Sequence, residues 1–515
     1  MSFIEVFLLS CLVLFSFYRL KFLMLFFQQE EYDNVRFIKY AFRRFKLIDK
    51  KLSFIILILF PVMLLWKYAS LLLLVLFVLF GIKESRALQK AKKKLVITNR
   101  VKLIFLVSFV LIGLELYFLR FLPFLWESFL IIQSLPFILP LANMLLFPLR
   151  KYREAQFISS AKAKLQEVNP TIIGITGSYG KTSVKHILGH LLSSFENTLW
   201  TKGSINTVLG ICSVLNRELN ASHKYFISEM GAYKKGSIAR LCRLTPPTNG
   251  IITAIGTAHY ERFKTEQSVA EAKFEMADFV VKKGGKLICN LTQINPKYIP
   301  EKPFIVPVGA GGKYAFDSIQ QTKEGLSFLF KEEGSAPVLI KAPLFGTHHA
   351  SNISLCLALL REMGYPMSTL KAALHNLPQI THRLEVKKQG DITLIDDAYN
   401  SNPTGFKSAL ETLNLLKTTR SILVTPGMVE LGKIHQKAHL EVGREAGKTA
   451  DIVLAVLPSR IPSFCQGVLE GNHAKLIQVA SFKEAYAWLE AHQQAGDVVL
   501  YENDLPDIYE NKVSL

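Results

Sequence analysis

Long apolar runs fill the first 150 residues of the chain, and shorter hydrophobic segments that alternate with polar ones follow. The long runs cover residues 3–18, 53–81 and 103–149. Because a helix needs about 20 apolar residues to cross a bilayer, these runs predict membrane-spanning helices. The second run is interrupted only at Lys67 and Tyr68, so it fits either a hairpin of two short spans or one long tilted helix.

The third run contains polar residues that bear on its function. Arg120 and Pro123 divide it into two spans, while three further polar residues lie inside the spans: Glu115, Glu127 and Gln133. They either face neighbouring helices and headgroups or form a polar site for a lipid headgroup, since ionisable groups in a bilayer are costly.

Basic residues gather between the apolar runs, in residues 19–51, 83–102 and from 150 onward. Cytoplasmic loops carry an excess of Lys and Arg, so all three segments are expected inside. One initial span followed by two hairpins meets this condition. The sequence therefore predicts about five spans in a bacterial-type inner (cytoplasmic) membrane, with the N-terminus outside and the rest of the chain in the cytoplasm.

The composition excludes several other classes. The net charge is +20, but much of it lies beside the apolar runs, and no aromatic-basic pattern or helix-turn-helix signal indicates a nucleic-acid partner. None of the six cysteines forms a C-x-x-C pair, which argues against a zinc site or a disulfide framework. Buried free thiols in a reducing compartment are expected.

The remainder of the chain alternates strands with helices. A P-loop α/β central domain is predicted for residues 165–383, and a Rossmann-like domain for residues 384–515, with strands at 393–396, 421–425, 451–456 and 497–501. The fold class is thus an α/β soluble part preceded by an all-α transmembrane region over residues 1–150.

A phosphate-binding loop follows the first strand of this part, residues 171–175. It reads Thr176, Gly177, Ser178, Tyr179, Gly180, Lys181 and Thr182, and a helical stretch follows. Its glycines let backbone N–H groups approach phosphate oxygens, and the helix N-terminus adds positive charge. Lys181 can reach the β- and γ-phosphates, and Thr182 can bind Mg²⁺. The strict pattern requires glycine at position 175, where this chain has Ile175.

Further polar residues stand where strands are predicted to end. Glu229 follows the hydrophobic residues 225–227, so it is expected at a strand's carboxyl end, where ligands bind in α/β sheets. A carboxylate there suits Mg²⁺, although a surface glutamate in a loop is the plainer interpretation. Asp396 and Asp397 follow a strand and precede a helix, which also fits a helix-capping turn. Lys273 taken alone is a lysine on a helix surface.

Eight motifs in this order resemble those of the Mur ligase family, the ATP-dependent peptide ligases of peptidoglycan synthesis. Besides the phosphate loop they are centred on Asn206 with Gly210, Glu229, His259 with Lys273, Asn352, Arg383, Asp397 with Asn400, and residues 426–432 with His439. The resemblance covers residues 165 to about 450. It is strongest to the members that add D-alanyl-D-alanine to UDP-muramoyl tripeptide.

The resemblance implies an enzyme that forms an amide through an acyl phosphate and releases ADP. Its implied catalytic residues are Lys181, Glu229, His259, Lys273 and Arg383. Its implied nucleotide-binding residues are Thr176, Gly177, Ser178, Gly180, Lys181, Thr182, Asn352, Arg383, Asp397 and Asn400. Two Mg²⁺ ions are implied, one on Thr182 and Glu229 and one on His259 and Lys273, with Lys273 carbamylated by CO₂.

The chain departs from the family at both ends and at one nucleotide contact. Membrane spans replace the small domain that grips the UDP-sugar, and residues 501–507 replace the usual K-G-S, which contacts substrate. His349 stands where asparagine is usual. The alternatives are therefore a membrane-bound ligase for a lipid-linked or polymeric carboxylate, of the poly-γ-glutamate synthetase type, and an ATP-binding scaffold without activity. The intact Lys181, Thr182, Glu229 and His259 argue against the scaffold. The scattered cysteines argue against an ammonia-using ligase with a four-cysteine zinc insert, and the missing signature motif against a transport ATPase.

Overall fold

The computed structural model describes residues 3–30, 32–44, 69–90, 94–256, 263, 265–399, 401–429 and 431–503. The chain divides into two compact units, of which the first ends at Arg153 and the second begins at Glu154. Helix α7, Phe147–Val168, contributes its first turns to one unit and the rest to the other. Each unit is built around its own hydrophobic cores.

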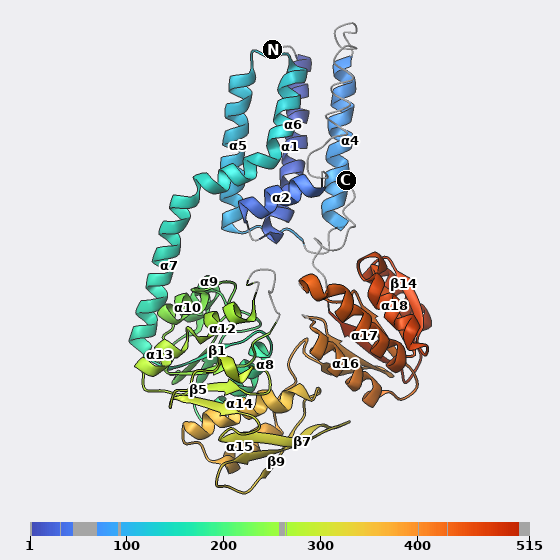
Figure 1. Ribbon diagram of the computed structural model, residues 1–515. Helices are drawn as coiled ribbons and strands as arrows, with labels where there is room; N and C mark the ends of the chain where they lie inside the picture. The colour runs from blue at the N-terminus through green and yellow to red at the C-terminus, as the bar shows by residue number, and fades with distance from the viewer. Residues whose placement is uncertain are drawn as a thin grey trace. The chain divides into compact units, whose positions relative to one another are not determined.

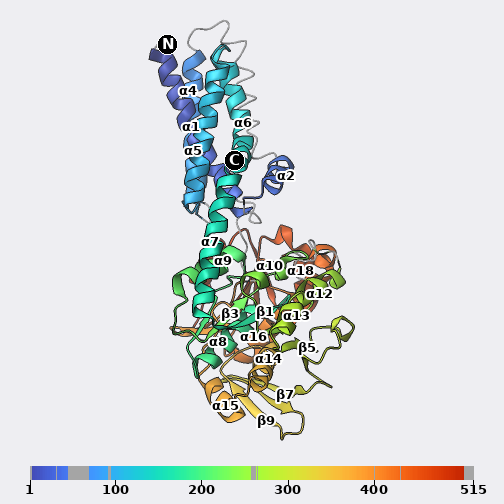
Figure 2. The same ribbon diagram turned by 90° about the vertical axis from the view of Figure 1, so that its left-hand side faces the viewer.

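The first unit is entirely helical in its described part. Its helices are α1 (Phe3–Gln29), α2 (Asn34–Arg44), α4 (Ala69–Lys90), α5 (Asn99–Leu119) and α6 (Phe124–Leu145). The long helices run side by side, with α1 packed on α4 and α6 and α5 packed on α6 (Figures 1 and 2). Three segments of these helices are long and apolar enough to cross a membrane: Val6–Gln29, Asn99–Leu119 and Trp126–Leu145.

Charged residues inside this bundle have partners on neighbouring helices. Helix α1 continues past the apolar run 3–18 and therefore contains Arg19. The guanidinium of Arg19 is buried and pairs with Glu84 of α4. Pairing with a carboxylate is what allows a buried arginine here. Glu115 accepts a hydrogen bond from the Ser134 hydroxyl of α6 at 2.7 Å, so it faces a neighbouring helix. Residues 53–68 lie outside the described residues, and the choice between a hairpin and one helix there stays a prediction.

The second unit begins with a nine-stranded sheet in the order β2-β3-β1-β4-β5-β6-β7-β8-β9. Strands β1 to β6 are parallel, and β7 to β9 form an antiparallel meander. The strands are β1 (Thr171–Thr176), β2 (Thr198–Trp200), β3 (Tyr225–Glu229), β4 (Asn249–Ile252), β5 (Leu287–Asn290), β6 (Ile305–Val308), β7 (Tyr314–Thr322), β8 (Gly325–Glu332) and β9 (Val338–Ala342). Because β1 lies between β3 and β4, its carboxyl end is a topological switch point, where ligands bind in such sheets.

Helices cover both faces of this sheet. They are α8 (Lys181–Ser193), α9 (Val208–Glu218), α10 (Ser237–Leu244), α12 (Glu266–Phe274), α13 (Ala277–Lys282), α14 (His348–Glu362) and α15 (Met367–His375). One hydrophobic core joins α8, α14 and α15 to the sheet, and the other joins α9, α10, α12, α13 and the end of α7. Alternate residues of β1 enter the two cores, with Ile173 and Ile175 in the first and Ile172 in the second.

A six-stranded sheet follows, in the order β10-β11-β15-β12-β13-β14, parallel except for β10. Its strands are β10 (Glu385–Gln389), β11 (Ile392–Asp397), β12 (Ser421–Thr425), β13 (Ile452–Val456), β14 (Lys475–Val479) and β15 (Val498–Glu502). Its helices are α16 (Pro403–Leu416), α17 (His435–Thr449), α18 (Pro462–Gly471) and α19 (Phe482–His492). The last strand is inserted between β11 and β12, which makes Glu502 the register partner of Asp397.

The structure confirms the α/β prediction for the second unit and the buried free cysteines, all six of which are unpaired. The strand predicted at 421–425 is β12 residue for residue. The antiparallel meander β7 to β9 and the edge strand β14 were not predicted.

Candidate active site

The predicted phosphate loop lies between the carboxyl end of β1 and the first turn of α8. Gly180 is the residue that caps α8, with a left-handed φ of 79° that favours glycine. Gly177 has no room for a side chain, because a Cβ there would lie 1.8 Å from Oγ1 of Thr253. The loop therefore brings backbone N–H groups and a 13-residue helix N-terminus to one point.

Hydrogen bonds to the segment after β4 fix the shape of this loop. The Ser178 amide donates to the Ala254 carbonyl at 2.8 Å, and the Gly256 amide donates to the Ser178 hydroxyl at 3.0 Å. The Thr176 hydroxyl donates to the Met230 carbonyl at 3.0 Å. The hydroxyls of Thr176 and Ser178 thus hold the loop, while its main chain faces the site.

Lys181 folds over the loop that it follows. Its Nζ donates to the Gly177 carbonyl at 2.7 Å and to the Ser178 carbonyl at 3.4 Å. Burial lowers the pKa of Lys181, the charge of Glu229 raises it, and the charge of Arg383 lowers it further. The ammonium therefore lies where it would meet a phosphate held by the loop.

Glu229, the last residue of β3, collects three donors. Its Oε2 accepts from the Thr182 hydroxyl and from Lys185 Nζ, each at 3.0 Å, and its Oε1 accepts from Asn206 Nδ2 at 3.1 Å. The hydroxyl of Thr182 and the carboxylate of Glu229 are oxygen donors side by side, which is the donor set that Mg²⁺ prefers. The two predicted ligands of one metal are therefore together.

Lys185 is a residue of this site that the sequence reasoning missed. It is fully buried on α8, pairs with Glu229 and also reaches the carbonyl of Gly203. Burial lowers its pKa, and Glu229 opposes that effect. Its spacing of four residues from Lys181 puts both lysines on one face of α8, and this was the available signal.

Replacing Lys185 by methionine is expected to destabilise the second unit by about 3 kcal/mol, because the buried carboxylate of Glu229 loses its charge partner. Saturating Mg²⁺ is expected to restore part of the loss by taking the place of the ammonium. The apparent melting temperature, with and without Mg²⁺, measures both effects. Lys224→Met is the matched control, since its pair with Glu196 is exposed and such pairs contribute about 0–1 kcal/mol. Equal melting temperatures for the two variants would contradict the role given to Lys185.

Lys273 is buried on α12, with 3% of its surface exposed, so its interpretation as a surface lysine is wrong. Its pKa lies well below the usual value because of burial, with a further contribution from the charge of Lys181. A neutral amine close to the phosphate loop is the form that can add CO₂. The other predicted ligand of the second metal, His259, lies outside the described residues.

Arg383 stands in a turn whose neighbours have left-handed backbone. His382 has a φ of 58° and Leu384 a φ of 50°, and such conformations are strained for residues other than glycine. The Arg383 charge contributes to lowering the pKa of five residues in the middle of the site: Lys181, Lys185, His186, His348 and His349. The positive charge of Arg383 therefore reaches the middle of the site, where a cation suits a polyphosphate.

Family models match the two α/β parts of the chain. The Mur ligase middle domain matches residues 175–360, and the Mur ligase, glutamate ligase domain matches residues 382–501. The chain belongs to the Mur ligase family. Its matched segments contain the phosphate loop, Glu229, Lys273 and Asn352 in the middle domain, and Arg383 in the second.

Named relatives are similar to a little over half of the chain. UDP-N-acetylmuramoyl-tripeptide–D-alanyl-D-alanine ligase of Escherichia coli (strain K12) is 32% identical over 297 residues, covering 56% of this chain and 64% of the relative. The protein of that name from Bacillus subtilis (strain 168) is 30% identical over 296 residues, covering 55% and 62%. The chain thus spans less than two thirds of the length of these relatives.

Solved structures agree on the fold. MurF from Acinetobacter baumannii superposes with a TM-score of 0.59 at 24% identity, covering 70% of this chain and 79% of that one. MurF ligase from Thermotoga maritima in complex with ADP gives a TM-score of 0.59 at 24% identity and covers 70% and 82%. At this identity the likeness establishes the Mur ligase α/β fold.

The start of α14 packs against the phosphate loop of this Mur ligase. A Cβ on Gly180 would lie 2.9 Å from Oδ1 of Asn352, so the predicted contact residue adjoins the loop. Asn352 Nδ2 is 3.4 Å from Nδ1 of His349, which is fully buried and has a pKa well below its usual value because of burial. Within the described part of the chain, His349 Nε2 has no hydrogen-bond partner.

Asp397, the predicted nucleotide residue of the second Mur ligase domain, is buried at the end of β11. It is 8% exposed, and its Oδ1 accepts from the Leu384 amide at 3.3 Å. The capping-turn interpretation is wrong for Asp397, because the helix-capping side chain is that of Asn402, which accepts from the Gly405 amide. Asn400, predicted beside it, lies outside the described residues.

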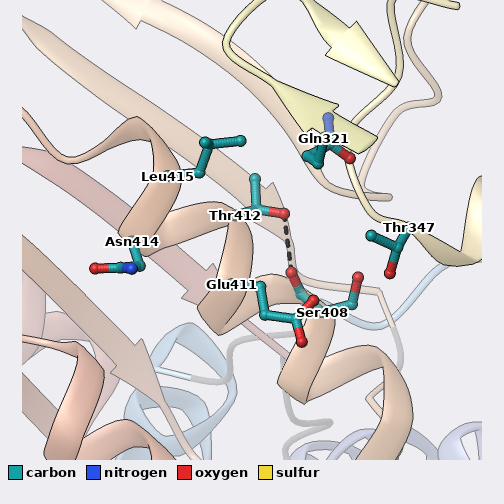
Figure 3. Close-up of a pocket in the computed structure, with 7 residues that line it drawn as sticks. All are labelled: Gln321, Thr347, Ser408, Glu411, Thr412, Asn414 and Leu415. Carbon is teal, nitrogen blue, oxygen red and sulfur yellow. Dashed lines mark hydrogen bonds between the residues drawn. The ribbon is translucent and has the colours of Figure 1, made fainter. Parts of the chain in front are cut away.

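A pocket of about 230 Å³ lies where α16 faces the middle domain. Figure 3 shows side chains of α16 on one side and Gln321 with Thr347 on the other, and the lining residues are Gln321, Thr347, Ser408, Glu411, Thr412, Asn414 and Leu415. Sites for small molecules usually measure about 300–1,000 Å³. No predicted site residue is among those that line it, so this pocket is not assigned to the reaction.

Proposed function

We propose that this Mur ligase forms an amide bond between a carboxylic acid and an amine at the cost of ATP, in the synthesis of peptidoglycan precursors. The observation that carries the proposal is the meeting of Lys181 and the phosphate loop with the Thr182–Glu229 pair at the carboxyl ends of β1 and β3. This combines a phosphate cradle with oxygen donors for a divalent cation.

ATP is the nucleotide that the site suits. The loop amides between Gly177 and Gly180, the N-terminus of α8 and Lys181 would contact the β- and γ-phosphates, and Arg383 would add a second cation. Asn352 and Asp397 are the proposed further contacts, with Asn400. Mg²⁺ on Thr182 and Glu229 would neutralise charge that develops on the transferred phosphoryl group.

A second Mg²⁺ is proposed on His259 and Lys273. An amine does not bind Mg²⁺, but addition of CO₂ to neutral Lys273 would convert it to a carbamate with two oxygen donors. The burial of Lys273 and its lowered pKa support this modification, since both favour the neutral amine.

The proposed reaction has two steps. A substrate carboxylate oxygen attacks the γ-phosphorus of ATP, the bond to the bridging oxygen breaks, and an acyl phosphate and ADP form. The substrate amine then attacks the acyl carbon, phosphate leaves, and the amine loses a proton. Lys181 and Arg383 would stabilise the negative charge on the phosphoryl oxygens, since both cations are already positioned beside them. The reaction needs no nucleophile from the protein.

The substrates proposed first are those in the names of the relatives, UDP-N-acetylmuramoyl-tripeptide and D-alanyl-D-alanine. One observation favours a second acid. The family models match residues 175–360 and 382–501, and before these the described part of the chain has three helices long and apolar enough to cross a membrane. A lipid-linked or polymeric carboxylate is the alternative acid, and a multi-pass location with the ligase domains in the cytoplasm is proposed.

The test is ATP-dependent phosphate release by the full-length protein in detergent, with both proposed substrates and with each omitted in turn. Release that requires both substrates and is lost in Lys181→Ala is expected. ATP binding without release on these substrates would exclude them and direct the assay to lipid-linked carboxylates. Absence of ATP binding would contradict the ligase proposal as a whole.

A further inference from the structure

Two buried acids meet at the carboxyl edge of the second sheet. Asp397 ends β11 and Glu502 ends β15, these parallel strands are neighbours, and the two residues are register partners. Glu502 is fully buried, and Asp397 is 8% exposed. Two buried carboxyl groups on adjacent strands repel each other strongly when both are ionised, so one of them holds a proton that it can donate to the other.

The surroundings decide which acid keeps the proton. Burial raises the pKa of Glu502 well above its usual value, and the charge of Asp397 raises it further. Burial raises the pKa of Asp397 to about 6, while the charge of Arg383 and the hydrogen bond from Glu502 oppose that rise. Near neutral pH the pair therefore holds one proton, on Glu502, and Asp397 is the carboxylate.

Neighbouring groups hold Glu502 in place as a donor. The Ser401 hydroxyl donates to Glu502 Oε1, and the buried Oε2 has no hydrogen-bond partner among the described residues, so Oε2 is the oxygen free to carry the proton. The next residue, Asn503, is also buried, with its amide bonded to the Asp397 carbonyl at 3.1 Å and its side chain to the Gly427 carbonyl at 2.6 Å. The strand end is thus fixed on both sides of Glu502.

The Asp397 carboxylate in turn holds the turn that carries Arg383. Its Oδ1 accepts from the amide of Leu384, one of the two residues with left-handed φ that flank Arg383. Asp396 holds the other, through a bond of 2.8 Å between its Oδ2 and Nδ1 of His382. Strained backbone persists only where the surrounding structure fixes it, and here Asp396 and Asp397 do so together with Glu385, whose Oε2 accepts from the His382 amide at 3.3 Å.

We propose that Glu502 is a positioning residue that keeps one proton and donates it to Asp397, so that the Asp397 carboxylate holds the strained turn presenting Arg383. The inference rests on the proposed function, in which Arg383 contacts a phosphate of ATP. Acidification through about pH 6 adds a second proton to the pair, removes its charge and so loosens its hold on Arg383.

Among the described residues, a small set of charged groups surrounds the pair. On the turn and on β11 they are Arg383, His382 and Asp396, and on β10 they are Glu385, which accepts from the His382 amide, and Lys387, which lies 3.9 Å from Asp396. Beyond β15 the loop after β12 presents the Gly427 carbonyl. His439 on α17, which accepts from the Met428 amide of that loop, has a pKa lowered to about 4 by burial and is neutral above it.

The first experiment measures ATP affinity of the full-length protein with Mg²⁺ between pH 5.5 and 8.5, by displacement of a fluorescent ATP analogue. Glu502→Gln keeps a donor for Asp397 and an acceptor for Ser401, so affinity within about twofold of wild type and an unchanged acid midpoint near pH 6 are expected. Glu502→Leu removes the donor, so about tenfold weaker binding and a midpoint at higher pH are expected.

Two results would overturn the inference. Loss of affinity in Glu502→Gln equal to that in Glu502→Leu would mean that Glu502 acts as a carboxylate. An unchanged midpoint in Glu502→Leu would mean that Glu502 does not act through Asp397. Glu470→Gln is the control, an acid-to-amide change at an exposed pair with Arg444.

A second measurement needs no nucleotide and separates this inference from the proposed function. A raised folded-state pKa makes an acid stabilising below its unfolded pKa, and this contribution is lost as pH rises. The melting temperature of Glu502→Gln relative to wild type is therefore expected to increase from pH 5 to pH 8. A difference that does not change with pH would show that folded Glu502 keeps no extra proton and would overturn the inference even if ATP binds.

Discussion

Lys181→Ala is expected to lower ATP-dependent phosphate release by about a thousandfold, with little change in folding. The Lys181 ammonium lies against the loop, 2.7 Å from the Gly177 carbonyl, and a bound phosphate would replace that oxygen as its partner. The charge it supplies is needed most when the γ-phosphoryl group is in transfer. The decrease should therefore fall on kcat as well as on KM for ATP. Steady-state release at saturating acid and amine measures both.

The control for Lys181 is Lys235→Ala, which removes a lysine from an exposed pair with Glu271 of α12. It should leave phosphate release within about twofold of wild type. Lys181→Arg is not a conservative change here, because a planar guanidinium does not fit the space of an ammonium inside the loop. More than a tenth of wild-type activity in Lys181→Ala would contradict the role given to this lysine.

The sequence was most informative where chemistry is carried by short segments. Glycines at 177 and 180, between a strand and a helix, let the backbone of the loop approach a phosphate closely. At Gly177 the structure leaves no room for a side chain, because a Cβ would lie 1.8 Å from Oγ1 of Thr253. Glu229 was expected at a strand end and is the last residue of β3. These features depend on a few consecutive residues, so a short sequence pattern is enough to predict them.

Features that depend on distant segments were not predicted. Glu502 and Asp397 meet only because the last strand is inserted between β11 and β12, which no local pattern specifies. Lys273 lies on a nine-residue helix whose apolar residues form no clear stripe, so its buried face could not be identified. Lys185 resembles any helical lysine until Glu229 is placed opposite it.

The first unit shows the same limit. The charge pattern predicts that a basic loop begins at Arg19, yet Arg19 lies inside α1 and pairs with Glu84, 65 residues further along the sequence. Hydropathy describes the apolar surface that a helix offers to lipid. It does not show that a charged residue on the helix is paired with a partner inside the bundle. Helix ends were therefore less well predicted than the presence of helices.

Lys273→Met is expected to lower phosphate release by about a hundredfold or more, because it removes the proposed carbamate ligand of the second Mg²⁺. Methionine matches the length and burial of the lysine stem, so the packing of α12 should be kept and the melting temperature should change little. Lys273→Glu places a carboxylate near the position of the carbamate and is expected to recover part of the activity. Phosphate release by the three proteins, at matched Mg²⁺ concentrations, measures this order.

Dependence on CO₂ distinguishes a carbamate from an unmodified buried lysine. Removing bicarbonate from the buffer should lower the activity of the wild type and leave that of Lys273→Glu unchanged. A carbon-13 carbamate signal should appear in the wild type after addition of labelled bicarbonate and be missing in Lys273→Met. The lowered pKa of Lys273 gives the sign of the pH effect, since acidification protonates the amine and so reduces the fraction that is open to CO₂. Full activity of Lys273→Met would show instead that this lysine serves packing alone, and the second metal would then need another ligand.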